Sequence, residues 1–214
     1  MHTHCEHSPD SRTPVGAQAA AIRAAGLDVV CATDHDTIEG AFRLREIADG
    51  FRVIVGEEVS SRDGEIIGLF LERPVPPGLS GEETIARIRL QGGLVSIPHP
   101  FSRNRRRRVR RDALDRLWPL ADCIEVFNAR EAFAADNERA AAFARERGIA
   151  PAAGSDAHRA AELGRAYCEV DDFAGRDDFI AALRGGTVHG RLSGIAVHLF
   201  TRYDVLRKRL GRRP

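Results

Sequence analysis

The sequence contains few cysteines, no long apolar run and no excess of either charge. None of its four cysteines forms a Cys-x-x-Cys pair, which argues against a zinc knuckle and a disulfide scaffold. No apolar run approaches the length of a membrane span and no signal peptide leads the chain, so we expect a cytoplasmic protein with no membrane partner. Lysine and arginine total 32 against 31 acidic residues, and this balance implies no obligate polyanionic partner.

The length and composition fit one domain with a real core. The chain has 214 residues, of which 43% are hydrophobic. The alternation of strands and helices fades near Gly190. We therefore expect a main domain over residues 1–190 and an accessory segment over 191–214. No feature of the sequence indicates an oligomeric state.

Short apolar runs alternate with helical patterns along the chain. Strands are expected at 27–32, 51–55, 66–71, 94–97, 123–127, 149–152 and 166–170, and helices at 14–25, 37–48, 80–91, 111–117, 132–147 and 176–184. Such alternation is typical of α/β proteins with parallel strands, in a barrel or an open sheet. Active sites in these folds collect at the carboxyl ends of the strands.

Metal-ligand side chains follow these strands. His35, Glu58 and His99 each come just after a predicted strand, and His2 and His4 would face the same way on an extended segment. The candidate metal ligands are His2, His4, Asp10, His35, Glu58, Glu65, His99, Asp156 and His158. Nitrogen and oxygen ligands without cysteine suit Mn, Zn or Fe.

Each of these residues also has an ordinary structural interpretation. Asp156 could cap a helix, and His99 could be a turn residue between prolines. However, five of the eight histidines fall in the pattern, and only His7, His189 and His198 lie outside it. The combined pattern favours one convergent metal site.

The order and spacing of these motifs resemble the PHP (polymerase and histidinol phosphatase) family. The matching stretches are His2-Thr3-His4, Ser8-Pro9-Asp10, Thr33-Asp34-His35-Asp36, Gly56-Glu57-Glu58, Pro98-His99-Pro100 and Gly154-Ser155-Asp156-Ala157-His158. The resemblance implies a distorted (β/α)7 barrel with the metal site at the carboxyl ends of its strands. It also implies two or three divalent metal ions per chain and hydrolysis of phosphate esters.

The resemblance further implies how the ligands divide among the ions. His2, His4, Glu58 and Asp156 would hold a first metal. Glu58 would bridge to a second metal, completed by His99 and by Glu65, which stands where many relatives have histidine. Asp10, His35 and His158 would hold the third.

These assignments lead to a reaction in which a metal-bound water attacks the phosphate of a small phosphorylated metabolite or a nucleotide. Asp34 would either orient a ligand imidazole or cap the following helix. Arg103 and Arg130 follow strands on the expected site edge, and we expect at least one of them to bind the substrate phosphate.

Two other functions stay open at this stage. The basic loop 103–111 could track a phosphate backbone, which would make the protein a nuclease or a phosphoesterase of nucleic-acid ends. Only Phe101 and Trp118 flank that loop as stacking partners. Alternatively, the chain could be a non-catalytic, metal-binding regulatory module.

The first strand of the barrel is expected to be very short. Relatives usually have a few strand residues before the histidine pair, whereas only Met1 precedes His2 here. Either the natural start lies upstream or the pair sits at a frayed end. A few apolar residues added before Met1 are expected to raise both metal affinity and thermal stability.

Overall fold

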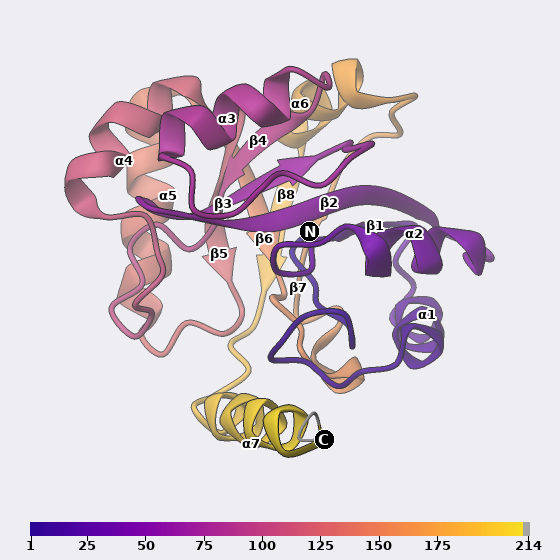
Figure 1. Cartoon of the computed structure of the whole chain (residues 1–214). Helices are drawn as coiled ribbons and strands as arrows, with labels where there is room; N and C mark the ends of the chain where they lie inside the picture. The colour runs from indigo at the N-terminus through magenta and orange to yellow at the C-terminus, as the bar shows by residue number, and fades with distance from the viewer. Residues whose placement is uncertain (212–214) are drawn as a thin grey trace.

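A mixed six-stranded sheet forms the centre of the computed structural model, which describes residues 1–211. Its strands lie side by side in chain order and curl into half of a barrel (Figure 1). They are β1 (Val29–Ala32), β2 (Arg52–Ser61), β3 (Gly64–Leu69), β4 (Leu94–Ile97), β5 (Cys123–Asn128) and β6 (Ala150–Gly154). A separate antiparallel pair, β7 (Ala166–Glu169) and β8 (Thr187–Gly190), lies beside β6. The expected α/β class is confirmed, whereas β8 was not predicted.

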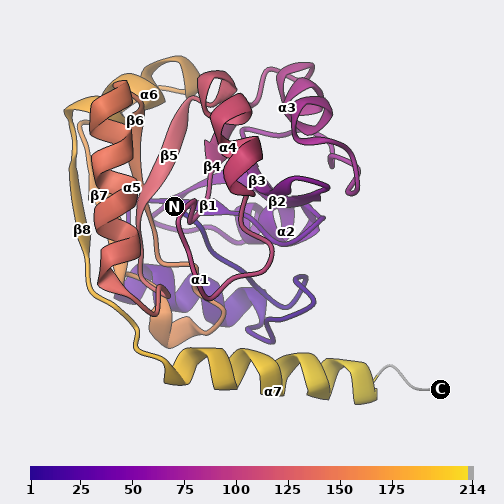
Figure 2. The same cartoon turned by 90° about the vertical axis from the view of Figure 1, so that its left-hand side faces the viewer.

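Helices cover the outside of the sheet (Figures 1 and 2). They are α1 (Val15–Ala24), α2 (Glu39–Glu46), α3 (Gly81–Arg89), α4 (Arg111–Leu117), α5 (Ala134–Arg147), α6 (Arg176–Gly185) and α7 (Ala196–Gly211). The core contains fully buried Ile22, Leu44, Ile88 and Leu117, one from each of the first four helices. Each such side chain contributes roughly 1.5–3 kcal/mol when it leaves water.

The direction of β3 differs from the sequence-based expectation of parallel strands. β3 pairs antiparallel with both β2 and β4, while the remaining neighbours in the sheet are parallel. β2 also runs on to Ser61, so Glu58 lies within a strand rather than after one. The reason is a tight hairpin at Arg62 and Asp63. Because β3 runs backwards, its amino end brings Glu65 to the edge where the parallel strands place their carboxyl ends.

Residues 1–4 bridge the two outer strands of the sheet. The Thr33 amide, just after β1, donates to the carbonyl of Thr3 at 3.0 Å. On the β6 side, the N-terminal ammonium donates to the carbonyl of Ala153 at 2.8 Å, and the Asp156 amide donates to that of His2 at 2.8 Å. This short segment is the expected first strand, and it lies inside the fold (Figure 1).

Helix α7 lies apart from the other helices, across one end of the molecule (Figures 1 and 2). It is held by polar contacts: the Arg159 guanidinium pairs with Asp204 at 3.0 Å, and Lys208 donates to the carbonyl of Glu6 at 2.5 Å. This helix forms most of the predicted accessory segment, whose last three residues lie outside the described range. Within residues 1–211, no helix combines the length and hydrophobicity needed to cross a bilayer.

Candidate metal centre

Histidine and carboxylate side chains converge at one end of the sheet in four overlapping groups. Within each group, the candidate ligand atoms all lie within 4.8 Å of one another. The groups are His2, His4 and Glu58; His2, His99 and Asp156; His35, Glu58 and Glu65; and His4, Asp10, His35 and His158. All nine predicted metal ligands are therefore brought together.

Glu58 occupies the middle of this cluster. Its two carboxylate oxygens lie 3.0–3.3 Å from nitrogens of four imidazoles, those of His2, His4, His35 and His99. The side chain is 1% exposed. A buried carboxylate with candidate metal-binding imidazoles beside both of its oxygens could be shared between two cations.

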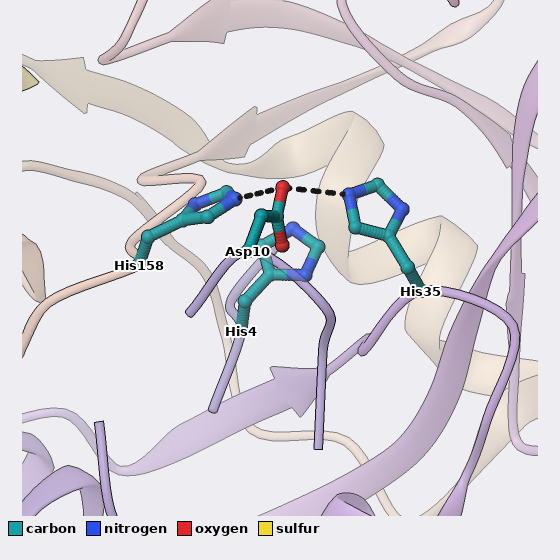
Figure 3. Close-up of side chains that lie close together, drawn as sticks. All are labelled: His4, Asp10, His35 and His158. Atoms are coloured by element: carbon teal, nitrogen blue, oxygen red, sulfur yellow. Dashed lines mark hydrogen bonds and ion pairs between the residues drawn. The ribbon is translucent and has the colours of Figure 1, made fainter. Parts of the chain in front are cut away.

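Asp10 joins two histidines on the other side of His4. Its Oδ2 lies 3.0 Å from His158 Nε2 and 3.4 Å from His35 Nε2. Figure 3 shows these three side chains and His4 pointing toward one another from separate segments of the chain. Asp10 is 21% exposed in its side chain, so this group lies nearest to solvent.

Hydrogen bonds fix the orientation of His4. The Ser8 hydroxyl donates to Asp34 Oδ1 at 2.9 Å and therefore accepts from His4 Nδ1, which is also 2.9 Å away. His4 Nε2 then carries the lone pair that faces Glu58 and Asp156. Asp34 thus acts on an imidazole through Ser8. It does not cap α2, whose N-terminus has no side-chain cap.

Glu125 orients two further histidines. Its Oε1 lies 3.2 Å from His2 Nδ1, and its Oε2 accepts from the His99 amide at 2.8 Å. His158 Nδ1 donates to the backbone carbonyl of Asp156 at 2.8 Å. In His2 and His158, as in His4, an Nδ1 contact leaves Nε2 directed into the cluster. This is the usual arrangement of metal-binding imidazoles.

The backbone is strained at two of the predicted ligands. His99 and Asp156 have φ angles of 30° and 51°, in the left-handed region that non-glycine residues rarely adopt. Such conformations persist where the surroundings impose them, and they cluster at functional sites. Nearby, Gly154 is required because a Cβ atom there would collide with the Glu125 carboxylate.

The cluster strongly favours positive charge. Burial alone would lower the pKa of His35, but Glu58 and Asp10 raise it to about 10. Burial would likewise lower the pKa values of His2 and His4, yet the surrounding carboxylates raise both. Conversely, the neighbouring cations hold the pKa of Asp10 well below its usual range despite its burial. The carboxylates therefore stabilise positive charge at these imidazoles, whereas burial lowers the pKa of His158 to about 4.

Several buried ligand atoms lack a hydrogen-bond partner among the described residues. They include His4 Nε2, His35 Nδ1 and Asp156 Oδ1. A buried polar atom without a partner is costly, and divalent ions bound within these groups would supply partners. The donor set, the field and these atoms together fit divalent metal ions.

Comparison with known proteins supports the resemblance identified from the motifs. The chain is 44% identical to the uncharacterized protein MJ1587 of Methanocaldococcus jannaschii over 107 residues, which are 49% of this chain and 60% of that protein. It is 38% identical to MJ0417 of the same organism over 122 residues, which are 56% of this chain and 52% of that protein. The matched stretches thus span little more than half of these relatives.

The family model described as PHP-associated matches residues 134–188. The fold matches a two-domain protein of Bacteroides vulgatus containing a predicted PHP-like metal-dependent phosphoesterase, with a TM-score of 0.62, 18% identity and coverage of 99% of this chain and 68% of the other. The chain has the PHP fold. The resemblance drawn from the sequence motifs is confirmed.

Other solved structures share this PHP fold. PsfC of Pseudomonas syringae aligns with a TM-score of 0.71 at 17% identity, covering 97% of this chain and 96% of the other. The lesion-specific endonuclease PfuEndoQ of Pyrococcus furiosus aligns with a TM-score of 0.63 at 17% identity, covering 88% of this chain and 56% of the other. Endonuclease Q has also been solved with a duplex carrying an abasic lesion at the active site, and it aligns with a TM-score of 0.66.

Each of the two arginines expected to bind phosphate pairs with a carboxylate outside the predicted ligand cluster. Arg103 pairs through Nε with Asp136 at 2.8 Å and stacks on the ring of Phe133. Arg130 is 3% exposed and pairs with Glu162 at 3.2 Å. Their loops have the right position, but nearby carboxylates draw both guanidinium groups away from the cluster.

Arg105 is the arginine that enters the cluster. Its guanidinium contacts the Asp156 carboxylate and lies 3.3 Å from Asn128 Oδ1. Burial would lower its pKa, but Asp156 and Glu131 raise it further above the usual value. Only Asn104 separates it from Arg103, and the sequence offers no signal that distinguishes these two arginines.

The sequence-based prediction also missed residues that position the ligands. Glu125 and Asn128 lie in β5, and Asn128 Nδ2 donates to both Glu125 Oε2 at 2.9 Å and Asp156 Oδ2 at 3.2 Å. The signal was present: Glu125 is the single acidic residue in the apolar run Cys-Ile-Glu-Val-Phe. A buried acid within a strand needs a polar partner, and here the partners are His2, His99 and Asn128.

Proposed function

We propose that this protein hydrolyses a phosphate ester of a small metabolite or nucleotide with the help of two or three divalent metal ions. The observation that carries the proposal is the convergence of nine histidine and carboxylate ligands around the shared carboxylate of Glu58. Clustered ions of this kind clamp phosphate oxygens and activate water. The fold of phosphoesterases that resemble this chain supports the same reaction class.

The ligands divide into three sets in this proposal. His2, His4, Glu58 and Asp156 would hold one ion. Glu58, Glu65 and His99 would hold a second, and Asp10, His35 and His158 a third. Burial and the charge of Glu58 raise the pKa of Glu65. The second set therefore carries concentrated negative charge, which favours a hard cation such as Mn²⁺ over the alternatives.

The remaining residues would orient ligands and bind substrate. Ser8 and Asp34 hold the His4 imidazole, and Glu125 holds that of His2. We assign to Arg105 the role first expected of Arg103 and Arg130, because Arg105 alone of the three contacts a predicted metal ligand. A guanidinium at this position would neutralise phosphate charge that develops during attack by water.

The test is an activity measurement on metal-free protein reloaded separately with Mn²⁺, Zn²⁺ or Fe²⁺. The substrates are p-nitrophenyl phosphate and bis-p-nitrophenyl phosphate, which separate monoester from diester hydrolysis. We expect turnover that depends on added metal and is lost when chelator is present. No turnover of either ester with any metal would reject the proposal and favour a non-catalytic, metal-binding module.

Nucleic acid is a second candidate substrate, favoured by one observation. The loop 103–111 carries seven arginines next to the ligand cluster, and endonuclease Q, which shares the fold, binds duplex DNA at its active site. Phosphate-backbone contacts release counterions. Metal-dependent cleavage of labelled DNA, with affinity that falls steeply as salt rises, would support this alternative.

A further inference from the structure

A hollow of about 360 Å³ lies beside the metal-ligand cluster. The end of β2, the start of β3 and the basic loop 103–111 line this hollow. Its wall includes Ser60, Ser61, Glu65, Arg106, Arg107 and Arg108. Glu65 also belongs to the ligand group of His35 and Glu58, so the hollow and the cluster share a side chain.

Three arginines of the hollow have no carboxylate partner within residues 1–211: Arg106, Arg107 and Arg108. The contacts of Arg107 and Arg108 are weak and neutral: Arg107 Nη1 lies 3.4 Å from Ser60 Oγ, and Arg108 Nη1 lies 3.3 Å from a backbone carbonyl. By contrast, Arg110 of the same loop pairs with Asp63 at 2.7 Å. The hollow therefore has uncompensated positive charge.

The backbone of this loop is fixed against β3. The Glu65 amide donates to the Arg107 carbonyl at 2.7 Å, and the Arg110 amide donates to the Asp63 carbonyl at 2.9 Å. Gly64 lies directly against the backbone of Arg108, where a Cβ atom would collide, and Val109 is 1% exposed. The arginine side chains thus project from a scaffold attached to a predicted metal ligand.

We propose that this hollow binds a second phosphate of the substrate, separate from the phosphate that lies at the metal centre. Guanidinium groups without carboxylate partners are good ligands for phosphate, and the hydroxyl of Ser60, which accepts from Arg107, adds a donor. The substrate class is then an organic bisphosphate. A nucleic-acid strand fits less well because no aromatic side chain for base stacking lines the hollow.

This inference rests on the proposed phosphoesterase activity. Two measurements distinguish a failure of the second-phosphate site from a failure of the activity. The first is the ratio of kcat/KM for a bisphosphate to that for the matching monophosphate, with adenosine and ribose phosphates as substrates and Mn²⁺-loaded protein. In Arg106→Ala/Arg107→Ala, we expect this ratio to fall about tenfold to a hundredfold, because charge-assisted bonds to the second phosphate are lost. The matched control is Arg43→Ala on α2. Its side chain pairs with Glu39 and Glu46 and does not line the hollow, so the ratio should not change.

The second measurement is calorimetric binding of adenosine bisphosphate, which needs no turnover. We expect the Kd to rise at least about tenfold in the double variant and to recover in part in Arg106→Lys/Arg107→Lys, since lysine restores the charge but not the guanidinium geometry. If the ratio and the Kd both match wild type, the inference is wrong even where hydrolysis is intact. A double variant that loses affinity for single-stranded DNA but not for bisphosphate would overturn it in favour of nucleic acid. Absence of any hydrolysis, with bisphosphate binding that still depends on these arginines, would reject only the activity.

Discussion

The metal-ligand cluster and the neighbouring seam between β1 and β7 differ in how tightly they are packed, although residues 1–4 belong to both. In the cluster, imidazoles are held from behind by Ser8, Glu125 or a backbone carbonyl, and the charged groups face opposite charges. The seam between β1 and β7 instead contains a hollow of about 800 Å³, lined by Met1, Cys31 and Cys168 among others. Hydrogen bonds and charges thus fix the side chains of the cluster at a place where the sheet itself is barely closed.

From this difference we expect that divalent ions, where the cluster binds them, would stabilise the closure of the barrel. His2 and His4 come from the bridging segment, whereas Glu58 lies in β2 and Asp156 follows β6. Ions shared among these residues would fasten the segment to both sides of the seam. Binding energy then counts as folding energy, since the complete ligand set exists only when the seam is closed.

The largest effect should come from breaking the cluster itself. Asp156→Asn removes a carboxylate that lies 3.3 Å from His4 Nε2 and 3.6 Å from His2 Nε2. We expect metal affinity to fall by more than about a hundredfold, beyond the loss typical of residues that only support ligands, and hydrolysis to be abolished. Calorimetric Mn²⁺ titration and p-nitrophenyl phosphate turnover measure the two effects.

His189→Ala is the control for that experiment. His189 lies in β8, is half-exposed, pairs with the exposed Glu169 and stacks on the ring of Tyr167. The metal affinity and the turnover of the His189→Ala variant should match those of the wild type. Wild-type affinity in Asp156→Asn, with the fold verified by circular dichroism, would contradict the ligand assignment.

A smaller loss should follow from disturbing the support of the ligands. Glu125→Gln keeps the size of a side chain that contacts His2 Nδ1 at 3.2 Å but removes its charge. Burial raises and the neighbouring His2 lowers the pKa of Glu125, which lies below its usual value, so the group is a carboxylate at neutral pH. We expect about a tenfold to hundredfold loss of metal affinity with the fold intact.

Metal titration of Glu125→Gln should be compared with Glu169→Gln, in which the altered side chain is exposed. An unchanged affinity in Glu125→Gln would mean that the cluster positions His2 without this carboxylate. A carboxylate that contacts a predicted ligand would then matter no more to metal binding than an exposed one.

The parts of the cluster differ in how far the sequence predicts them. Apart from Asp10, which lies in a turn before α1, the nine predicted ligands lie on strands, just after strands or on residues 1–4, where the backbone sets the side-chain direction, and the motifs placed all nine in one site. The reversal of β3 was not predictable from alternating apolar runs, which do not indicate strand direction. Arg105 was missed because a long side chain on a loop takes its direction from neighbouring carboxylates. Arg103 and Arg130 illustrate this, since each turns to a carboxylate outside the cluster.

The smallest effect should come from strengthening the seam. Apolar, β-branched residues added before Met1 would continue the bridging segment along the hollow and pair with main-chain groups of the outer strands. Each kcal/mol of stabilisation raises the Tm of a protein this size by about 2–4 °C, and we expect a gain of this order. Calorimetry of metal-free protein isolates the effect from that of the ions. A glycine–serine extension of equal length is the control, because it adds chain without strand propensity. Equal Tm values for the two extensions would mean that residues 1–4 and their hydrogen bonds already close the seam as tightly as the fold allows.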